Sequence, residues 1–258
     1  MTVYFIGAGP GAADLITLRG ARLLGECGTC VYAGSLVPPE LLALCPDGVE
    51  LVDTARMPLP DIIDVIAAAD ARGHDVARLH SGDLSLYSAL AEQQRELTAR
   101  GIDHRIVPGV PAFAAAAAAL GTELTVPGVG QSLLISRVST LSTDMPPGED
   151  LASLAATGVT LALHLAAHRA EEIVAALAPH YGSECPTATV AFASRANEQI
   201  VRCPLRRLPE TLDAADIRRT AVIFVGRVLD PARSEATDSY LYSHARMTKL
   251  RTDRESTR

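Results

Sequence analysis

The residues best suited to chemistry form a turn at 80–84 with the sequence His-Ser-Gly-Asp-Leu. An apolar run ends just before this turn, and a helical pattern begins just after it, near Leu86. Because Gly82 has no Cβ, a ligand can approach its backbone closely. The carboxylate of Asp83 can accept hydrogen bonds from free N–H groups in the turn or at the helix start. This pattern predicts a site that holds its ligand mainly by backbone groups, although an ordinary capped turn between a strand and a helix has the same residues.

Two further turns combine glycine and proline at the end of a short apolar run. The first is Gly-Ala-Gly-Pro-Gly at 7–11, and the second is Pro-Gly-Val-Pro-Ala at 108–112. The first turn can be fitted to the dinucleotide-binding pattern G-x-G-x-x-A. That interpretation is weak, because the next strand ends in Tyr-Ala-Gly-Ser at 32–35, without the acidic residue that holds a ribose hydroxyl. Pro10 also supplies no N–H group to a pyrophosphate.

The elements that carry these turns alternate between short apolar runs and longer helical patterns. This alternation predicts an α/β fold with a largely parallel sheet that helices cover on both faces. Ligands of such sheets bind at the carboxyl ends of the strands, where the turns at 7–11, 34–37, 81–85 and 108–112 all lie. The expected strands are 3–6, 29–33, 49–52, 76–79 and 105–107, and the expected helices are 14–26, 38–44, 61–71, 86–100 and 112–120.

A stretch rich in glycine and proline, residues 121–130, separates this half from a second one. The second half reads as mixed α/β, in which the strands at 187–192 and 199–203 pair as a hairpin-like unit. We therefore predict two domains, 1–121 and 122–233, followed by a polar, arginine-rich and flexible tail at 234–258. The other strands expected in the second half are 132–136, 159–165 and 221–228, and its helices are 152–156, 169–180 and 209–215.

Composition excludes several classes of protein. The chain has 258 residues, a net charge of -7 and no Trp, which disfavours binding to nucleic acid or to an acidic membrane. No window approaches the ~20 apolar residues of a membrane span. No signal peptide is visible at the N-terminus, so we expect a cytoplasmic protein. The five cysteines are scattered, and the pair Cys27 and Cys30 has no second pair at zinc-ligand spacing, so we expect no metal site.

Five segments in the same order resemble the tetrapyrrole (corrin/porphyrin) methyltransferases, which are S-adenosylmethionine-dependent enzymes of cobalamin and sirohaem synthesis. The segments are GAGPG at 7–11, VYAGSLV at 31–37, RLHSGDLSLY at 78–87, PGVPAF at 108–113 and GQSLLISR at 130–137. The resemblance covers about residues 3–228. YAGSLV and ELTVPGVGQS most resemble the branch that methylates precorrin-4 at carbon 11, with cobalt-precorrin-4 as the substrate in the anaerobic route.

The resemblance implies two α/β domains with S-adenosylmethionine folded into the cleft between them, no metal, and a homodimer. The cofactor contacts that it implies are Pro10, Ser81, Gly82, Asp83, Leu86, Pro111, Ala112, Leu165 and Ala193. The chain departs from the family pattern at the first loop, where Ala12 and Ala13 replace an acidic residue and a proline. It also has Leu84 in place of the proline of GDPSLYG. Without these prolines the loop backbones are less restricted in conformation, but the glycines are kept.

The implied tetrapyrrole substrate bears many carboxylates, and arginine binds carboxylates well. Candidate substrate-binding residues are Tyr32, Ser35, Arg56, Arg137 and Arg195, although a core tyrosine, a turn serine and surface arginines would look the same. We expect no catalytic side chain, because a sulfonium is already a good leaving group and an electron-rich substrate carbon is the nucleophile.

The histidines have competing interpretations. His80 could carry a proton, but a loop histidine bonded to backbone looks the same. The spacing of His164 and His168 brings them to one face only on a helix, so a structural or cleft-lining role is favoured over a metal site.

Alternative functions stay open at this stage. The chain could be another tetrapyrrole methyltransferase, such as one that acts on uroporphyrinogen III, or a methylase of a protein or RNA. The acidic charge and the lack of a basic patch disfavour an RNA target. A nucleotide-binding redox or regulatory protein is a more distant alternative.

Overall fold

The computed structural model describes residues 1–138, 144–230, 232, 237, 239, 240, 243, 246 and 249, and for Ser35 the backbone alone. The chain forms two compact units. The N-terminal unit comprises Met1–Ala116 together with the excursion Phe192–Glu198, and the C-terminal unit comprises Ala117–Ala191 and the chain from Gln199 onward. The domain limits at residues 121 and 233 stay predictions. The expected tail at 234–258 falls mostly outside the described residues.

The N-terminal unit is built on a five-stranded sheet in the order β3-β2-β4-β1-β5, and every neighbouring pair is parallel. This confirms the predicted parallel sheet. Its strands are β1 (Val3–Gly7), β2 (Thr29–Tyr32), β3 (Glu50–Asp53), β4 (Val76–His80) and β5 (His104–Val107). Its helices are α1 (Leu18–Leu24), α2 (Pro39–Leu42), α3 (Leu59–Ala71) and α4 (Leu90–Ala99), with the 3-10 turns η1 (Ala13–Leu15) and η2 (Gly34–Leu36). Helix α5 (Ala112–Leu120) spans the division between the units.

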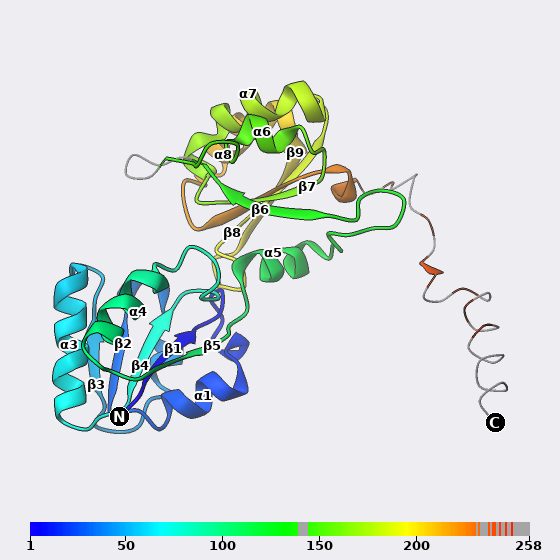
Figure 1. Cartoon of the computed structure of the whole chain (residues 1–258). Helices are drawn as coiled ribbons and strands as arrows, with labels where there is room; N and C mark the ends of the chain where they lie inside the picture. The colour runs from blue at the N-terminus through cyan, green and yellow to red at the C-terminus, as the bar shows by residue number, and fades with distance from the viewer. Residues whose placement is uncertain are drawn as a thin grey trace. The chain divides into compact units, whose positions relative to one another are not determined.

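Successive residues of a strand point to opposite faces of the sheet, and apolar side chains on each face pack against helices. Phe5 of β1 belongs to a buried cluster with Ile66 of α3 and Leu97 of α4, which lie on the same face in Figure 1. The next residue, Ile6, belongs to a second cluster with Leu24 of α1 and its neighbours. The sheet is therefore covered on both faces, and its functional groups can emerge only at the ends of the strands.

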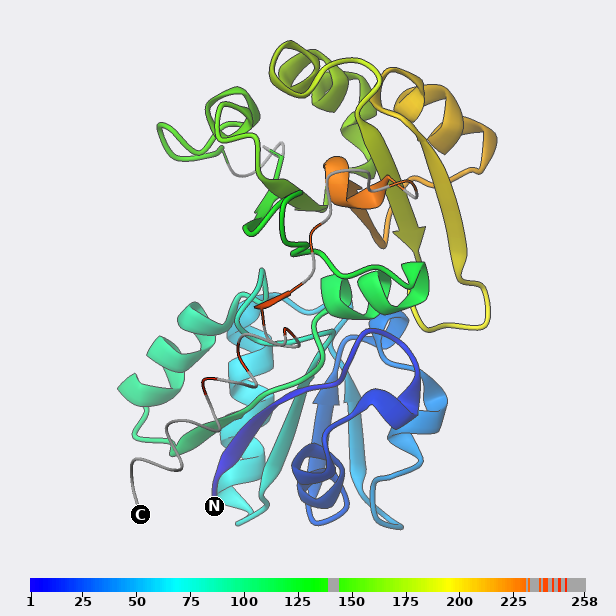
Figure 2. The same cartoon turned by 90° about the vertical axis from the view of Figure 1, so that its right-hand side faces the viewer.

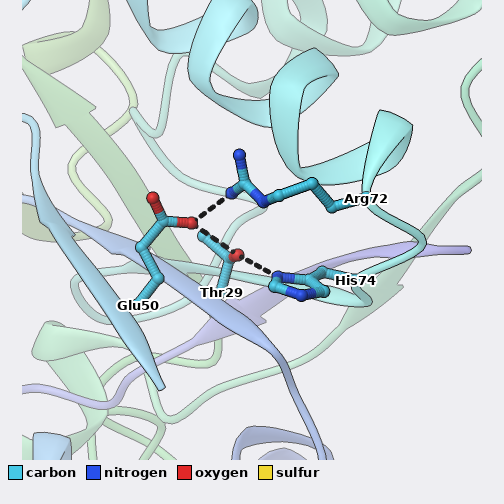
Figure 3. A network of polar contacts seen from close by, with 4 residues as sticks. All are labelled: Thr29, Glu50, Arg72 and His74. Atoms are coloured by element: carbon cyan, nitrogen blue, oxygen red, sulfur yellow. Dashed lines mark hydrogen bonds and ion pairs between the residues drawn. The ribbon is translucent and has the colours of Figure 1, made fainter. Parts of the chain in front are cut away.

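A polar network closes the amino ends of β2 and β3, as Figure 3 shows. The hydroxyl of Thr29 donates to Oε2 of Glu50 over 3.0 Å and lies 3.2 Å from Nδ1 of His74. Arg72, just after α3, forms an ion pair with the same carboxylate. Because Thr29 and Glu50 are the first residues of their strands, this network lies at the end of the sheet away from the glycine turns.

The C-terminal unit is mixed α/β, as the sequence predicts. Its sheet has the order β6-β7-β10-β8-β9, in which only β6 and β7 run parallel. Figure 2 shows the long hairpin of β8 and β9 that the sequence predicts, and Figure 1 shows helices on one face of this sheet. The strands are β6 (Leu133–Arg137), β7 (Thr160–His164), β8 (Pro186–Ala191), β9 (Gln199–Pro204) and β10 (Ala221–Val225). The helices are α6 (Leu151–Ala155), α7 (Ala170–Tyr181) and α8 (Leu208–Ala214), with the 3-10 turns η3 (Ala167–Arg169), η4 (Leu205–Arg207) and η5 (Arg227–Leu229).

Two predicted helices begin too early. The helix expected at 14–26 starts only at Leu18, because the side chain of Thr17 accepts a hydrogen bond from the Gly20 N–H and caps it there. Leu18 itself is 92% exposed, so it is not part of the apolar face. The helix expected at 86–100 starts only at Leu90.

In the part of the chain that the structure describes, no helix is both long enough and apolar enough to cross a bilayer.

Candidate ligand site at the carboxyl end of the parallel sheet

Three glycines from three separate turns meet at the carboxyl end of the N-terminal sheet. A Cβ on Gly7 would lie 2.6 Å from the Cα atom of Gly109 and 2.8 Å from the carbonyl oxygen of Gly82. A Cβ on Gly109 would collide with the same carbonyl oxygen. We call these three residues the glycine junction. No larger residue fits at Gly7 or Gly109 without moving backbone, so the junction requires the glycines that the sequence singles out.

Backbone hydrogen bonds lock the first two turns together. The N–H of Gly82 donates to the Gly9 carbonyl over 2.7 Å, and the N–H of Gly9 donates back to the Gly82 carbonyl over 3.2 Å. The N–H of Ala8 donates to the His80 carbonyl over 2.7 Å and extends the pairing of β1 with β4. The turns therefore present a single backbone surface rather than independent loops.

Asp83 ties the central turn to the third one. Its Oδ2 accepts from the Gly109 N–H over 2.8 Å, and its Oδ1 accepts from the N–H of Ser85 over 2.9 Å and from the Ser85 hydroxyl. Partial burial alone would raise the pKa of Asp83, but these hydrogen bonds outweigh it and lower the pKa. The carboxylate stays ionised at neutral pH, as its role as an acceptor requires.

The loop between Asp83 and α4 contains two residues with left-handed backbone. Tyr87 and Ala89 both have φ of 52°, which is unusual for residues that carry a Cβ. Strain of this kind concentrates at functional sites, where surrounding contacts hold it. It also explains why α4 begins late, since Ala89 is the residue that precedes its first turn.

The excursion Phe192–Glu198 brings a fourth segment to this end of the N-terminal unit. The Ala12 N–H donates to the hydroxyl of Ser194 over 3.0 Å. Arg195 packs its side chain on Gly11 and donates from Nη2 to the Leu36 carbonyl over 3.2 Å. Ala193, which directly precedes Ser194 and Arg195 in the chain, is buried. The glycine at position 11 is required here, because a Cβ would overlap the Arg195 side chain.

A pocket of about 370 Å³ opens beside the glycine junction, on the face of the sheet that α3 and α4 cover. Its walls combine apolar side chains with a few polar groups, which is typical of ligand pockets. The cationic group in it is Arg78 of β4, and Ser81 and Tyr87 from the central turn and loop also line it. The apolar part of the wall includes Leu36, Val37, Met57, Leu59 and Ile62.

His80 lines the same pocket but stays neutral. Burial and the nearby charge of Arg78 lower its pKa to about 3. Its Nε2 is buried without a hydrogen-bond partner among the described residues, and its ring lies 5.8 Å from that of Phe5. A neutral imidazole with this pKa neither holds a proton at neutral pH nor takes one readily, so proton carrying is disfavoured.

Eight of the nine residues expected to contact the cofactor belong to the N-terminal unit: Pro10, Ser81, Gly82, Asp83, Leu86, Pro111, Ala112 and Ala193. They lie in the turns of the glycine junction, in the loop that follows Asp83, at the start of α5, and in the excursion. The ninth, Leu165, belongs to the C-terminal unit, where it follows β7 with φ of 52° and 55% exposure.

The residues expected to bind substrate lie in different parts of the fold and differ in burial. Tyr32 ends β2 and packs partly against a core cluster, and Arg56 is exposed in the turn after β3. Ser35 lies in η2, and its side chain is outside the described residues. Arg137 belongs to the C-terminal unit and donates to the Val138 carbonyl over 3.0 Å. Arg195 is engaged with the Leu36 carbonyl, as described above.

Sequence reasoning missed the polar groups around the pocket. Arg78 is 6% exposed and donates to Gln93 over 3.1 Å and to Thr54 over 3.0 Å. Asp53 accepts from the N–H groups of Gly34 and Ala55 and fixes the start of η2. Hydrogen bonds from these two N–H groups lower the pKa of Asp53. Arg78 itself was the signal in the sequence for these polar groups, because it is a charged residue within an otherwise apolar strand.

The cysteines and histidines give no metal centre in the described residues, which contain no group of three or more His, Cys, Asp or Glu able to hold an ion. Cys27 and Cys30 are free thiols in the core of the N-terminal unit. A hydrogen bond with Cys45 and burial raise the pKa of Cys27, so its thiol stays protonated. Burial lowers the pKa of His164, and His168 is exposed in η3.

Comparison with known proteins identifies relatives along almost the whole chain. The family profile of the Tetrapyrrole (Corrin/Porphyrin) Methylases matches residues 2–209. The precorrin-4 C(11)-methyltransferase of Rhodococcus erythropolis is 57% identical over 246 residues, which cover 95% of this chain and 98% of that protein.

Two solved structures share the fold. The X-ray structure of a cobalamin biosynthetic enzyme, cobalt precorrin-4 methyltransferase, has a TM-score of 0.86 and 35% identity, and the match covers 89% of this chain and 96% of that one. The uroporphyrin-III C-methyl transferase of Thermus thermophilus, complexed with S-adenyl homocysteine, has a TM-score of 0.74 and 28% identity. That match covers 92% of this chain and 96% of the other.

Proposed function

We propose that this chain, which belongs to the tetrapyrrole (corrin/porphyrin) methylases, transfers a methyl group from S-adenosylmethionine to carbon 11 of precorrin-4. The observation that carries the proposal is the glycine junction, where Gly7, Gly82 and Gly109 bring three turns into close backbone contact at the carboxyl end of a parallel sheet. The substrate comes from the relative that is 57% identical over 95% of the chain.

The residues present fit a nucleoside co-substrate. The glycines let the three turns pack backbone against backbone, so that peptide groups line this end of the sheet, and the ionised carboxylate of Asp83 fixes the third turn against the second. Pro10, Ser81, Gly82, Asp83, Leu86, Pro111, Ala112, Ala193 and, from the C-terminal unit, Leu165 would hold S-adenosylmethionine. When bound, it supplies a methyl group activated by a positively charged sulfur.

The work of the chain is then positioning and exclusion of water rather than acid–base chemistry. The hydrogen bonds between Gly9 and Gly82 and from Gly109 to Asp83 fix the turns before any ligand arrives. His80, with its pKa of about 3, is neutral and adds no positive charge beside a sulfonium. A neutral His80 agrees with a reaction in which an electron-rich substrate carbon attacks the methyl group.

The finer parts of the proposal concern metal content and assembly. We assign metal-free precorrin-4 as substrate, because the relative with that name is 57% identical, whereas the cobalt-precorrin-4 enzyme of known structure is 35% identical. Tyr32, Ser35, Arg56, Arg137 and Arg195 remain candidates for substrate contacts. A homodimer in the cytoplasm completes the proposal, and light scattering on the purified protein measures the number of chains.

The test is incubation of the protein with precorrin-4 and methyl-labelled S-adenosylmethionine, followed by mapping of the label on the product. Label at carbon 11 is expected, and added S-adenosylhomocysteine should suppress it. Label at another carbon, or label on uroporphyrinogen III alone, would replace the assignment by another activity of the family. Calorimetry with S-adenosylhomocysteine and NADH tests the nucleotide-binding alternative, because binding of NADH alone would exclude methyl transfer.

A further inference from the structure

The strongest unexplained group in the N-terminal unit is the buried guanidinium of Arg78. Only 6% of the residue is exposed. Burial lowers its pKa to about 10, which still leaves it charged at neutral pH. Its hydrogen bonds go to the neutral side chains of Gln93 and Thr54, and no ion pair joins it to a carboxylate anywhere in the described residues. A buried charge of this kind normally has an opposite partner.

The hydrogen bonds of Arg78 hold it in one orientation. Nε donates to Oε1 of Gln93, and Nε2 of the same amide donates over 3.0 Å to the carbonyl of Ala89, a residue with left-handed backbone. Nη1 donates to the hydroxyl of Thr54, which itself donates to the Tyr32 carbonyl over 3.0 Å. The guanidinium is thus fixed between the start of α4 and the turn after β3.

The remaining donors of Arg78 are available to the pocket. A guanidinium has five N–H donors, and Gln93 and Thr54 use two of them. Nη2 forms no hydrogen bond within the described residues. It is not completely buried either, so a ligand can reach it from open space. Arg78 lines the pocket of about 370 Å³, and that is where its free donors are reached.

We propose that Arg78 binds a carboxylate arm of the tetrapyrrole substrate in this pocket and so positions the macrocycle for methyl transfer. The inference rests on the proposed function and names a residue outside the set that the sequence singled out. A pocket of about 370 Å³ is too small for a whole macrocycle, so it takes one edge with its acetate or propionate arm. Apolar walls beside a single fixed cation suit such an arm, because the carboxylate loses water and gains a preset partner.

Glu92 limits which other ligands this pocket can bind. It lines the same pocket, is exposed, and forms no ion pair with Arg78. Its negative charge repels anions, and this repulsion is smaller for a single carboxylate that Arg78 can pair with than for a phosphate-rich ligand such as a nucleotide.

The kinetic test compares Arg78→Gln and Arg78→Lys with the wild-type protein, and uses Arg22→Gln as the matched control. Arg22 is an exposed arginine of the same unit, paired only with Glu26. For Arg78→Gln we expect the KM for precorrin-4 to rise tenfold or more while kcat changes less than twofold. Arg78→Lys keeps the charge without the planar fork and should recover part of the loss. A KM for Arg78→Gln equal to that of Arg22→Gln would overturn the proposal.

An equilibrium test works even where methyl transfer is absent or the variant is poorly active. The probe is uroporphyrin III, a stable tetrapyrrole polycarboxylate, whose binding is followed at several salt concentrations. Wild-type affinity should fall with salt, and Arg78→Gln should bind at least tenfold more weakly with a smaller salt dependence. A purely structural role would leave the salt dependence unchanged and so contradict the proposal. The fully esterified probe should bind wild type and Arg78→Gln equally, and a difference between them would also contradict it.

A readout of the co-substrate separates this inference from the proposed function. S-Adenosylhomocysteine should bind Arg78→Gln with wild-type affinity, because Arg78 makes no hydrogen bond to the turns of the glycine junction. Loss of that affinity together with probe binding would assign Arg78 to the architecture of the unit and overturn the inference. Failure of wild-type methyl transfer with intact probe binding would instead overturn the proposed reaction and leave the role of Arg78 standing.

Discussion

The backbone N–H of Gly109 donates to Oδ2 of Asp83 over 2.8 Å, although 26 residues separate them in the chain. This bond joins the turns that follow β4 and β5, while the backbone pairing of Gly9 with Gly82 joins those that follow β1 and β4. The carboxylate thus adds a side-chain link to the backbone contacts of the junction. Its removal tests whether the third turn is held in place by that link.

We expect Asp83→Asn to weaken binding of S-adenosylhomocysteine by about tenfold. The amide nitrogen cannot accept a hydrogen bond, and a charged acceptor contributes about 1.5–3 kcal/mol when well placed, less where it is partly exposed. Calorimetry at neutral pH measures the affinity. Asp47→Asn, at an exposed position without a described hydrogen bond or ion pair, is the control and should bind as the wild type does. Equal affinity of the two variants would show that Asp83 does not order the site.

Gly7→Ala should cost about 1–3 kcal/mol of folding free energy, the usual range for overpacking, and should also abolish measurable S-adenosylhomocysteine binding. The new Cβ would lie 2.6 Å from backbone atoms of Gly109, and backbone cannot rotate away as a side chain can. Urea unfolding measures the stability change. Gly25→Ala is the matched control, because Gly25 has φ of -72° and its nearest neighbour to a Cβ is at an ordinary 3.4 Å. A Gly7→Ala protein as stable as the Gly25→Ala protein would mean that the turns do not pack as closely as described.

The parallel sheet and its glycine turns could be predicted because each rests on a local pattern. The run at 76–79 is apolar apart from Arg78, as expected for a buried strand, and Gly82 lies in the turn that follows it. The helix boundary at Leu90 could not be read in the same way. Tertiary contacts hold Tyr87 and Ala89 in left-handed backbone, and nothing in their side chains signals this.

The pocket residues were harder to predict, since their meaning depends on contacts between distant segments. Arg78 sits in the motif that begins the central turn, but its burial and its bonds to Thr54 and Gln93 follow from the packing of β3 and α4 against β4. The charge of Arg195 makes it a candidate for substrate binding, but its partner within the chain could not be predicted from the sequence. The structure shows its Nη2 engaged with the Leu36 carbonyl.

Glu50→Gln should lower stability by less than about 1 kcal/mol and leave ligand binding unchanged. Glu50 and Arg72 form an ion pair whose side chains are 46% and 44% exposed, and exposed pairs contribute little. The network of Figure 3 also lies at the amino ends of the strands, away from the glycine junction. Urea unfolding and calorimetry with S-adenosylhomocysteine measure the two quantities. A loss of affinity without a loss of stability would show that the two ends of the sheet are coupled.

The lowered pKa of His80 should make the free energy of unfolding depend on pH. Its pKa is about 3 in the folded protein and about 6.5 in an unfolded chain, so between these values only the unfolded state binds the proton. The folded state therefore loses up to about 1.4 kcal/mol per pH unit as pH falls below 6.5. His80→Phe, which replaces a ring whose Nε2 has no described partner, should reduce this slope between pH 7 and pH 5. A remainder is expected from His164, because burial lowers its pKa as well. Urea unfolding at several pH values measures it, with the exposed His180→Asn as the control that keeps the wild-type slope. The lowered pKa of Asp83 acts only below its ordinary value of 3.8 and so stays outside this window. Parallel pH curves for wild type and His80→Phe would mean that His80 takes up a proton in the folded protein as readily as in the unfolded chain.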